Sequence, residues 1–501
     1  MQYILTAVIA LYLLFVIGVG VFIGRRSRAG AEGLGPLVTA MSAEASDMSS
    51  WLLMGLPGLA YLSGLADAGW TALGLALGTY LNFLLVAKRI RRYSVQLDAI
   101  TIPSFLSRRY GERKPVIMCI CSAVILIFFV PYVASGLAAI GKLFNSLFGW
   151  NYLLAVVIGA VVIISYTSVG GFSAVATMDL IQSVIMTVAL AVITAFGISQ
   201  AGGLEAVLDH ARSLPGYLSL TRSYDAATGT ARPYDFMNMA SMLAWGLGYF
   251  GMPHILVRFM AIRDEKELRL SRRIASVWVV ISMSIALLIG VIGCGVSKAG
   301  GIPRLLGADS ETVIVRLTGL LATKGVFAAI VGGMILAGIL AATMSTADSQ
   351  LLAAASAFSE NLLQDVFGIK MSQKQTVVTA RLTVVVIAVL AVFLAADPDS
   401  SVFAIVSFAW AGFGATFGPA ILFALFWRKS NRQGILAGLA AGGLMVFVWK
   451  FLIRPLGGIF GIYELLPAFL VNCLVAAVVS VLTGGPEQEV GESFDRYRRK
   501  L

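Results

Sequence analysis

The chain has 501 residues, of which 58% are hydrophobic and only 13% are charged, and its mean hydropathy is +0.88. A soluble globular protein carries about 25% charged residues, so this composition excludes a water-soluble enzyme or binding module. One helical crossing of a bilayer needs about 20 apolar residues, and this chain is long enough for roughly a dozen. A β-barrel is excluded too, because its strands alternate in polarity over short segments.

Thirteen apolar runs, bounded by charged residues, Gly or Pro, are predicted to cross the membrane. All should be helices, because a backbone in lipid must satisfy its own hydrogen bonds. The first run is too long for a signal peptide and lacks a small-residue cleavage site. In chain order the runs are 3–24, 37–64, 67–87, 116–147, 151–170, 175–199, 236–259, 275–297, 323–352, 376–396, 401–427, 434–453 and 463–483. The predicted fold class is an all-α polytopic membrane protein.

The basic residues set the predicted orientation. A formal net charge of +11 would suggest nucleic acid in a soluble protein. Here most Lys and Arg residues lie in connections that share one side of the membrane if there are thirteen spans. The positive-inside rule makes that side cytoplasmic, with the N-terminus outside and the C-terminus inside. The basic clusters lie at 25–28, 88–92, 108–114, 258–273, 370–381, 428–432 and 496–500. No nucleic-acid partner is expected.

Two predicted spans contain strong interruptions. The second holds Glu44, Asp47 and three serines ahead of a Pro-Gly pair at 57–58, and the seventh has three glycines and Pro253 within 245–254. Neither sequence favours a straight helix. With the first span set aside, these are helices one and six of ten. Matching breaks in two five-helix halves indicate an inverted-repeat transporter that binds ions and substrate at the breaks.

Several polar residues inside these runs are candidate site residues. Asp47 either caps a half-helix through its backbone amides or serves an ion or the substrate. Ser345, Asp348 and Ser349 share one helical face, and oxygen groups without Cys or His suit a hard cation. The alternative is that the hydroxyls bond their own helix. Asp179 is either a functional carboxylate or one that only begins a helix.

Glu44 and the aromatic residues near the breaks allow two interpretations. Glu44 is either an interfacial residue or a functional one. Trp51, Tyr132, Trp245 and Tyr249 lie beside a break or a proline, where they either pack or contact substrate. The four cysteines fall in apolar runs and are expected to be free.

The segments around the breaks resemble the sodium/solute symporter family, and within it the sodium/proline symporters. The resemblance covers essentially the whole chain. It rests on Ser46-Asp47-Met48-Ser49 with 51–58, on Gly170-Gly171-Phe172 followed by Asp179 and Gln182, on 248–260, and on Met344-Ser345-Thr346.

The resemblance implies a LeuT-type core, a five-plus-five inverted repeat, with one extra N-terminal helix. The implied units are an N-terminal helix and linker (1–36), the first repeat (37–200), an extracellular loop (201–235), the second repeat (236–427), two peripheral helices (428–483) and a cytoplasmic tail (484–501).

The resemblance also implies the site residues. The main sodium site uses backbone carbonyls and two hydroxyls, from Ala45, Met48, Ala342, Ser345 and Thr346. Asp47 supports that site or its coupling. A second ion site lies between Asp179 and the ninth span, with Asp348 and Ser349. The substrate contacts Ser49, Trp51, Tyr132, Trp245, Tyr249 and Pro253. No catalytic residue and no cofactor other than the coupling sodium are expected.

The implied function is sodium-coupled import of L-proline by alternating access in a bacterial plasma membrane. The expected partners are the substrate, sodium and the bilayer, with no obligate protein partner. Two departures from the proline-symporter pattern bear on substrate and ion count: Ser50 replaces a Gly, and Asp348 is not expected there.

Other functions stay open. They are symport of another amino acid or a carboxylate, proton coupling, and a sensor that keeps the transporter fold and needs a partner. A membrane enzyme is disfavoured because the chain has only two histidines, His210 and His254, for a nucleophile–base set or a metal site.

Overall fold

The computed structural model of the chain describes residues 1–27, 33–167 and 172–499. Arg28, Gly170, Gly171 and Lys500 of the sequence analysis lie outside the described residues. The α-helices are α1 (Gln2–Ser27), α2 (Pro36–Ala45), α3 (Leu56–Ser63), α4 (Leu65–Leu81), α5 (Lys88–Gln96), α6 (Ile102–Arg109), α7 (Val116–Phe148), α8 (Tyr152–Thr167), α9 (Phe172–Gln200), α10 (Leu204–Ser213), α11 (Phe236–Leu243), α12 (Pro253–Met260), α13 (Leu268–Lys298), α14 (Val313–Ala322), α15 (Val326–Ser356), α16 (Gln373–Leu394), α17 (Val402–Phe426), α18 (Arg432–Val448), α19 (Leu465–Leu482) and α20 (Gln488–Arg499).

Shorter elements connect or extend these helices. The π-helical segments are η1 (Trp51–Gly55), η2 (Asn82–Ala87), η6 (Ala357–Val366) and η7 (Trp449–Ile453). The 3-10 segments are η3 (Ala244–Gly251), η4 (Glu265–Glu267), η5 (Gly307–Thr312), η8 (Arg454–Leu456) and η9 (Gly458–Gly461). Strands β1 (Arg222–Asp225) and β2 (Thr230–Pro233) pair antiparallel, with Arg222 opposite Pro233.

Helices lie on all thirteen predicted apolar runs. Within the described ranges, ten helical stretches are long and apolar enough to cross a membrane. The other three runs are the two interrupted ones and α8, whose apolar part, Tyr152–Ser165, is short. The multi-helix membrane architecture is therefore confirmed, while thirteen crossings stay a prediction.

The first interruption lies where the polar residues are, not at the Pro-Gly pair. Helix α2 ends at Ala45, and regular helix resumes through η1 only after residue 50. Pro57 sits in the first turn of α3, where its missing amide hydrogen costs nothing. All of residues 39–58 are buried, so the freed backbone groups of the break face protein.

The second interruption is the 3-10 segment η3, and its glycines allow it to pack closely against neighbouring helices. A Cβ on Gly246 would lie 2.2 Å from the carbonyl oxygen of Gly74 on α4, and one on Gly248 would lie 2.0 Å from the indole nitrogen of Trp410 on α17. Met252 then adopts an extended conformation before Pro253 begins α12. The glycines break the helix as predicted, and they also bring η3 against two neighbouring helices.

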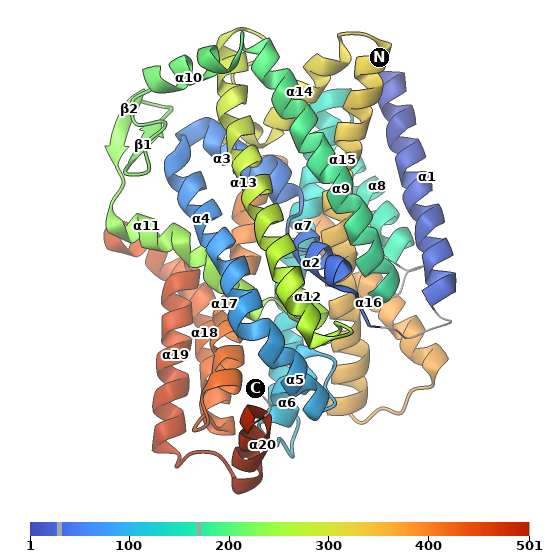
Figure 1. Cartoon of the computed structure of the whole chain (residues 1–501), viewed down its shortest axis with the longest axis vertical. Coiled ribbons are helices and arrows are strands. Elements are labelled where there is room, and N and C mark those ends of the chain that lie inside the picture. The colour runs from blue at the N-terminus through green and yellow to red at the C-terminus, as the bar shows by residue number, and fades with distance from the viewer. Residues whose placement is uncertain (28–32, 168–171, 500–501) are drawn as a thin grey trace.

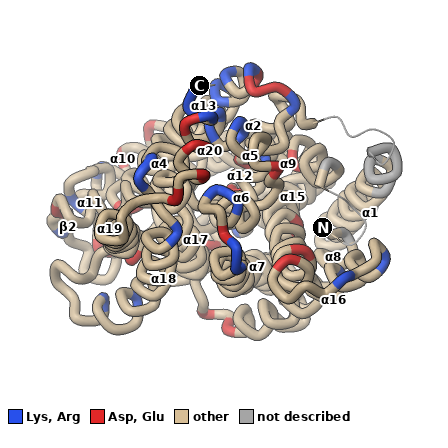
Figure 2. Tube along the Cα trace, turned by 90° about the horizontal axis from the view of Figure 1, so that it is seen from below, with Lys and Arg blue, Asp and Glu red and all other residues tan. Residues whose placement is uncertain are grey.

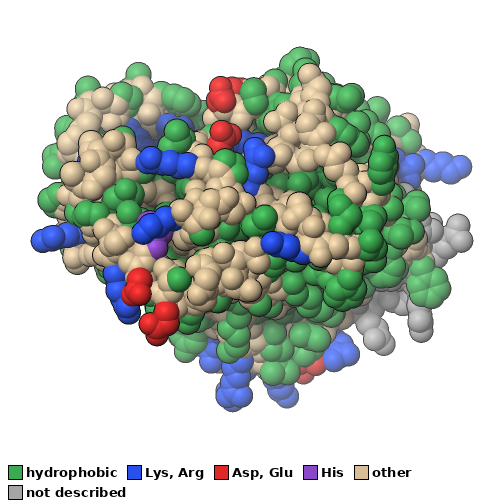
Figure 3. Space-filling model, turned by 90° about the horizontal axis from the view of Figure 1, so that it is seen from above, with side chains coloured by type: hydrophobic (Ala, Val, Ile, Leu, Met, Phe, Trp, Pro, Cys, Tyr) green, Lys and Arg blue, Asp and Glu red, His purple; other side chains and the backbone are tan. Residues whose placement is uncertain are grey.

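The two chain ends lie toward opposite ends of the molecule's long axis (Figure 1). We call the end formed by α5, α6 and α20 the basic end, because these helices carry the Lys and Arg clusters of 88–92, 108–109 and 496–499. Figure 2 shows these basic residues on the tube seen from below. The opposite end holds α10 and the β-hairpin, and there the space-filling view shows charged side chains scattered among hydrophobic ones (Figure 3).

Two segments expected to be a loop and a tail are ordered. The 201–235 segment forms α10 and the β-hairpin, so the fold contains two short strands besides its helices. The tail forms α20, which docks on α5 through stacking of Tyr497 on Tyr93, with ring centroids 4.2 Å apart. The four cysteines are free, as expected.

We predict that Gly246→Ala destabilises the protein by about 1–3 kcal/mol, because the added methyl group overpacks the α4 contact. Thermal unfolding of the purified protein in detergent measures the change. Gly461→Ala is the matched control, since no atom lies within 4 Å of a Cβ built there, and it should stay within about 0.5 kcal/mol. Equal shifts for both variants would contradict the close-packing argument.

Candidate ion and substrate site

Asp47 lies in the first break and links it to α7 and to the second break. Its Oδ1 accepts a hydrogen bond from Tyr132 on α7 at 3.2 Å, and its Oδ2 accepts one from Tyr249 on η3 at 2.7 Å. The indole of Trp51 donates to the Asp47 carbonyl at 2.9 Å. The carboxylate therefore accepts from tyrosine hydroxyls, and it joins both interrupted helices.

Glu44 is buried and not interfacial. Its side chain has 0% exposure, and its Oε2 accepts from Thr79 at 3.2 Å and from Tyr249 at 3.4 Å. Tyr249 thus touches both carboxylates of the first break. Burial of an ionisable group at this depth is costly unless it is hydrogen-bonded; here Oε2 has partners from α4 and η3, while Oε1 has none among the described residues.

Three of the five predicted sodium ligands converge at the end of α2. The Ser345 hydroxyl on α15 donates to the Ala45 carbonyl at 2.9 Å, and the Thr346 hydroxyl lies 3.4 Å from the same oxygen. The same Ser345 hydroxyl lies 2.8 Å from Asp179 Oδ1, and its single hydrogen serves one of these two oxygens at a time. Asp179 is therefore more than the first carboxylate of a helix, since it reaches the candidate ion site.

The remaining two predicted ligands are backbone carbonyls of neighbouring segments. Met48 lies within the break, and Ala342 lies one turn before Ser345 on α15. Both residues are buried.

The three residues of the predicted second ion site lie together, but an arginine accompanies them. Arg258 Nη2 donates to Asp179 Oδ2 at 2.9 Å and to Ser349 Oγ at 2.6 Å, and its Nε donates to Ser42 Oγ. Arg258 is 2% exposed and Asp179 is 0% exposed. Among the described residues, Asp348 Oδ2 has no hydrogen-bond partner.

Arg258 corrects the charge analysis, which counted it with the cytoplasmic connections. The residue is buried on α12, inside the predicted seventh span. Its partner Ser42 and the Glu44 partner Thr79 were also missed. An arginine inside an apolar run was the available signal, because such residues default to functional roles.

Three predicted substrate residues, Trp51, Tyr132 and Tyr249, hydrogen-bond Asp47, and two groups of side chains can be distinguished near it. Ser49 and Tyr132 line a narrow space, too tight for a water molecule, together with Thr346 and Gln350. The second group is an aromatic cluster in which Trp245 contacts other rings, with centroids at 6.1 Å for Trp51, 5.0 Å for Phe403, 5.1 Å for Tyr463 and 6.3 Å for Trp410. Pro253 lies apart from both groups and lines a larger cavity.

That larger cavity, of about 640 Å³, opens between elements of the basic end. Its walls include residues 91–103 of α5, α6 and their connection, together with part of η6. Its deep part reaches Pro253, Arg258 and Ser349. The cavity therefore extends from the basic end to the Arg258–Asp179 ion pair.

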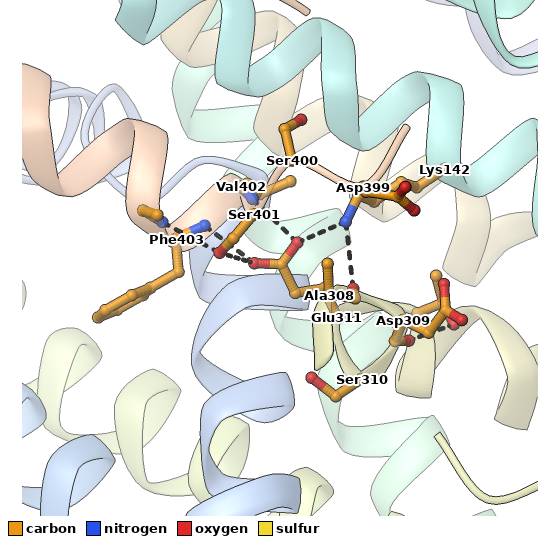
Figure 4. A network of polar contacts seen from close by, with 12 residues as sticks. Lys142, Ala308, Asp309, Ser310, Glu311, Asp399, Ser400, Ser401, Val402 and Phe403 are labelled. Atoms are coloured by element: carbon orange, nitrogen blue, oxygen red, sulfur yellow. Dashed lines mark hydrogen bonds and ion pairs between the residues drawn. The ribbon is translucent and has the colours of Figure 1, made fainter. Parts of the chain in front are cut away.

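Toward the opposite end, a buried ion pair ties three segments together (Figure 4). Lys142 Nζ on α7 lies 3.0 Å from Glu311 Oε2 on η5, with 6% and 4% side-chain exposure. Glu311 also accepts from the Ser401 hydroxyl at 2.7 Å and from the backbone amides of Val402 and Phe403 at 2.9 and 3.0 Å. A carboxylate here satisfies the free amides at the start of α17.

Helix α3 packs against η5 and against two further segments at the same end of the molecule, and these contacts close that end together with the ion pair. A Cβ on Gly58 would lie 2.8 Å from the Glu311 Cα, so η5 rests directly on α3. The Tyr217 hydroxyl of the 201–235 segment donates to the Tyr61 carbonyl at 3.0 Å. The amide of Leu305 donates to the Tyr61 hydroxyl at 3.1 Å. The 201–235 segment and the connection that holds Leu305 therefore both pack over α3.

Comparison with known proteins identifies the family. The model of the sodium:solute symporter family matches residues 29–442. The chain belongs to this family. It is 39% identical over 458 residues to the osmoregulated proline transporter OpuE of Bacillus subtilis, which covers 91% of this chain and 89% of the relative. It is 38% identical over 505 residues to a sodium/proline symporter of Staphylococcus aureus, covering 98% and 95%.

Solved structures agree on the fold. A Na⁺-coupled sialic acid symporter, described as substrate-bound and outward-open, matches with a TM-score of 0.75 at 17% identity and covers 97% of this chain and 99% of its own. Mhp1, a nucleobase-cation-symport-1 family transporter, matches with a TM-score of 0.53 at 12% identity, covering 93% and 97%. The LeuT-type fold expected from the sequence is confirmed.

The chain is thus a sodium-coupled symporter and a multi-pass membrane protein, not an enzyme. Both curated relatives come from bacteria, in agreement with the expected location in a bacterial plasma membrane.

We predict that Glu311→Gln destabilises this symporter by about 3–5 kcal/mol, because it leaves the Lys142 charge buried without its partner. Ser401→Ala is the matched control: it removes the N-cap hydroxyl of α17 and one hydrogen bond to Glu311 but leaves the Lys142 ion pair intact, and it should cost about 1 kcal/mol. Chemical unfolding of both purified variants measures the difference. If Glu311→Gln cost no more than Ser401→Ala, the ion pair would not be what holds this end closed.

Proposed function

We propose that this symporter imports L-proline with sodium by alternating access. The observation that carries the proposal is the meeting of the Ser345 and Thr346 hydroxyls with the Ala45 carbonyl where α2 ends. A helix end frees carbonyl oxygens, and such ends coordinate cations in transporters with broken helices. The substrate is inferred from the two relatives, whose names specify proline.

The proposed sodium site consists of oxygen atoms only. Its ligands are the carbonyls of Ala45, Met48 and Ala342 and the hydroxyls of Ser345 and Thr346. Oxygen ligands suit a hard cation, and only one full negative charge, on Asp179, lies in contact with them. Asp47 is not itself a proposed ligand. It accepts hydrogen bonds from Tyr132 and Tyr249 and so couples sodium binding to these two residues.

The proposed substrate site lies between the breaks, at Ser49, Trp51, Tyr132, Trp245, Tyr249 and Pro253. In this conformation the Ser49–Tyr132 space is closed around Gln350, whose side-chain amide has no partner among the described residues. An unpaired buried amide is costly, so a zwitterion that hydrogen-bonds Gln350 stabilises an opened site. Ser50, whose hydroxyl is also without a described partner, is the first residue to examine if another solute is the substrate.

The proposed topology has thirteen crossings, with the N-terminus outside and the basic end in the cytoplasm, following the positive-inside rule. The 640 Å³ cavity then opens to the cytoplasm, and the Lys142–Glu311 closure lies on the outer side. We therefore assign this conformation to the half of the transport cycle in which sodium and substrate are released into the cytoplasm.

The energy available is sufficient for accumulation. One charge crossing 100 mV releases about 2.3 kcal/mol, and a tenfold sodium gradient adds about 1.4 kcal/mol. Together they support an accumulation of roughly several hundredfold for a neutral solute moved with one sodium.

We predict sodium-dependent uptake of radiolabelled proline into proteoliposomes that unlabelled proline abolishes and other amino acids do not. Ser345→Ala should raise the sodium concentration for half-maximal uptake at least about tenfold, the cost of roughly 1.4 kcal/mol of ligand energy. Thr318→Ala is the control, because that buried hydroxyl bonds only the carbonyl of Ile314 on its own helix.

Three outcomes would contradict the proposal in different ways. Competition by another amino acid or a carboxylate would change the substrate. Uptake driven by a pH gradient in sodium-free buffer would show that protons, and not sodium, are the coupling ion. Sodium-stimulated binding without uptake would favour a sensor.

We also predict that Tyr132→Phe raises the half-maximal concentrations of both sodium and proline by about tenfold, because it removes a hydrogen bond to a buried carboxylate. Tyr152→Phe, which loses a bond between the start of α8 and the Ala395 carbonyl just after α16, should change either value less than about twofold. A change in proline affinity alone would show that Tyr132 does not couple the two sites.

A further inference from the structure

One guanidinium group joins four helices beside the proposed sodium site. Arg258 on α12 donates to Ser42 on α2, to Asp179 on α9, to Ser349 on α15 and to the carbonyl of His254 on its own helix. A guanidinium has five N–H groups, so these four bonds almost saturate it. The arginine is fixed in place and is not a mobile surface charge.

The groups that hold Arg258 have the composition of a cation site. They are one carboxylate and two hydroxyls, each on a different helix, and all are buried. The family resemblance implied a second ion site at two of these residues, Asp179 and Ser349, together with Asp348. In the structure their oxygens point at the guanidinium nitrogens at 2.9 and 2.6 Å. A second cation at these oxygens meets a positive charge within hydrogen-bond distance, and like charges repel strongly in a low-dielectric interior.

We propose that Arg258 is the resident cation of this second site, so that the protein binds one sodium ion and not two. The inference deepens the proposed function, since it rests on a sodium site at Ala45, Ser345 and Thr346. It makes Arg258 a residue that determines ion stoichiometry.

One carboxylate oxygen of Asp179 contacts Arg258, and the other contacts a ligand of the proposed sodium site. Oδ2 accepts from Arg258, while Oδ1 accepts from Ser345, a ligand of the proposed sodium site. Arg258 thereby positions the carboxylate and balances its charge. Sodium then encounters a neutral ion pair next to its ligands instead of a bare carboxylate.

Removal of the arginine charge should open the site to sodium. The vacated space would be bordered by Asp179, Ser42 and Ser349. Asp348 directly precedes Ser349 on α15, and its Oδ2 has no hydrogen-bond partner among the described residues. Two buried carboxylates without a counter-charge repel each other, and a bound cation or a proton relieves that repulsion. The cavity that reaches Arg258 and Ser349 gives sodium a route to this position.

The test counts sodium ions bound to the purified full-length protein. Equilibrium dialysis with radioactive sodium alone, without substrate, should give one ion per wild-type chain and two per Arg258→Gln chain. Arg258→Lys retains the charge and should give one. Arg109→Gln is the matched control, because Arg109 is equally buried, at 1% exposure, but bonds the Ala424 carbonyl far from the site.

Two sodium ions on the wild-type protein would overturn the inference, and so would one ion on folded Arg258→Gln. If Arg258→Gln does not fold, the wild-type and Arg258→Lys counts still decide, because two ions on either would overturn it. Because the assay uses no substrate, a failure to transport proline would reject the proposed substrate while leaving the ion count to stand or fall by itself.

Discussion

The rest of the site depends on how the protein satisfies backbone carbonyls freed by the two helix breaks. Three of them accept from side-chain N–H donors: Asp47 from the indole of Trp51, Tyr249 from the amide of Asn82, and Trp245 from the indole of Trp410. The Ala45 carbonyl instead accepts from hydroxyls of a distant helix, α15. A hydroxyl can rotate to present a lone pair, whereas an N–H cannot accept. That chemical difference separates a structural cap from a place where a cation can enter.

Asp47 gives this cation site its connection to the substrate region. Its carboxylate is held by tyrosines from α7 and η3, so the first break, the second break and α7 share one buried group. In the proposed mechanism, a sodium ion that orders the end of α2 also orders Tyr132, which lines the closed space beside Ser49. Linkage requires the converse, that substrate held there strengthens sodium binding by the same factor.

The breaks and much of the site were predictable from sequence because glycine, proline and buried carboxylates leave local signals. The partners of those carboxylates were not, since they come from distant segments: Arg258 lies 79 residues from Asp179, and Lys142 lies 169 residues from Glu311. Counting basic residues for topology placed Arg258 in a connection, although it falls inside an apolar run. Lys142 gave the same kind of signal within the fourth run, but Glu311 lies in a connection where nothing distinguishes it.

The Arg258–Asp179 pair also bears on how the empty carrier returns. If Asp179 were ionised without a counter-charge, the ion-free protein would carry a buried negative charge, and its reorientation would be opposed or assisted by the membrane potential. With Arg258 in contact, the Asp179 carboxylate is paired with a positive charge in the absence of sodium. In the proposed cycle, the charge that the potential moves in the loaded protein is the sodium ion at Ala45, Ser345 and Thr346, since the zwitterion moved with it is neutral. In that proposal Arg258 takes the place of a second coupling ion, so that one sodium carries the coupling charge.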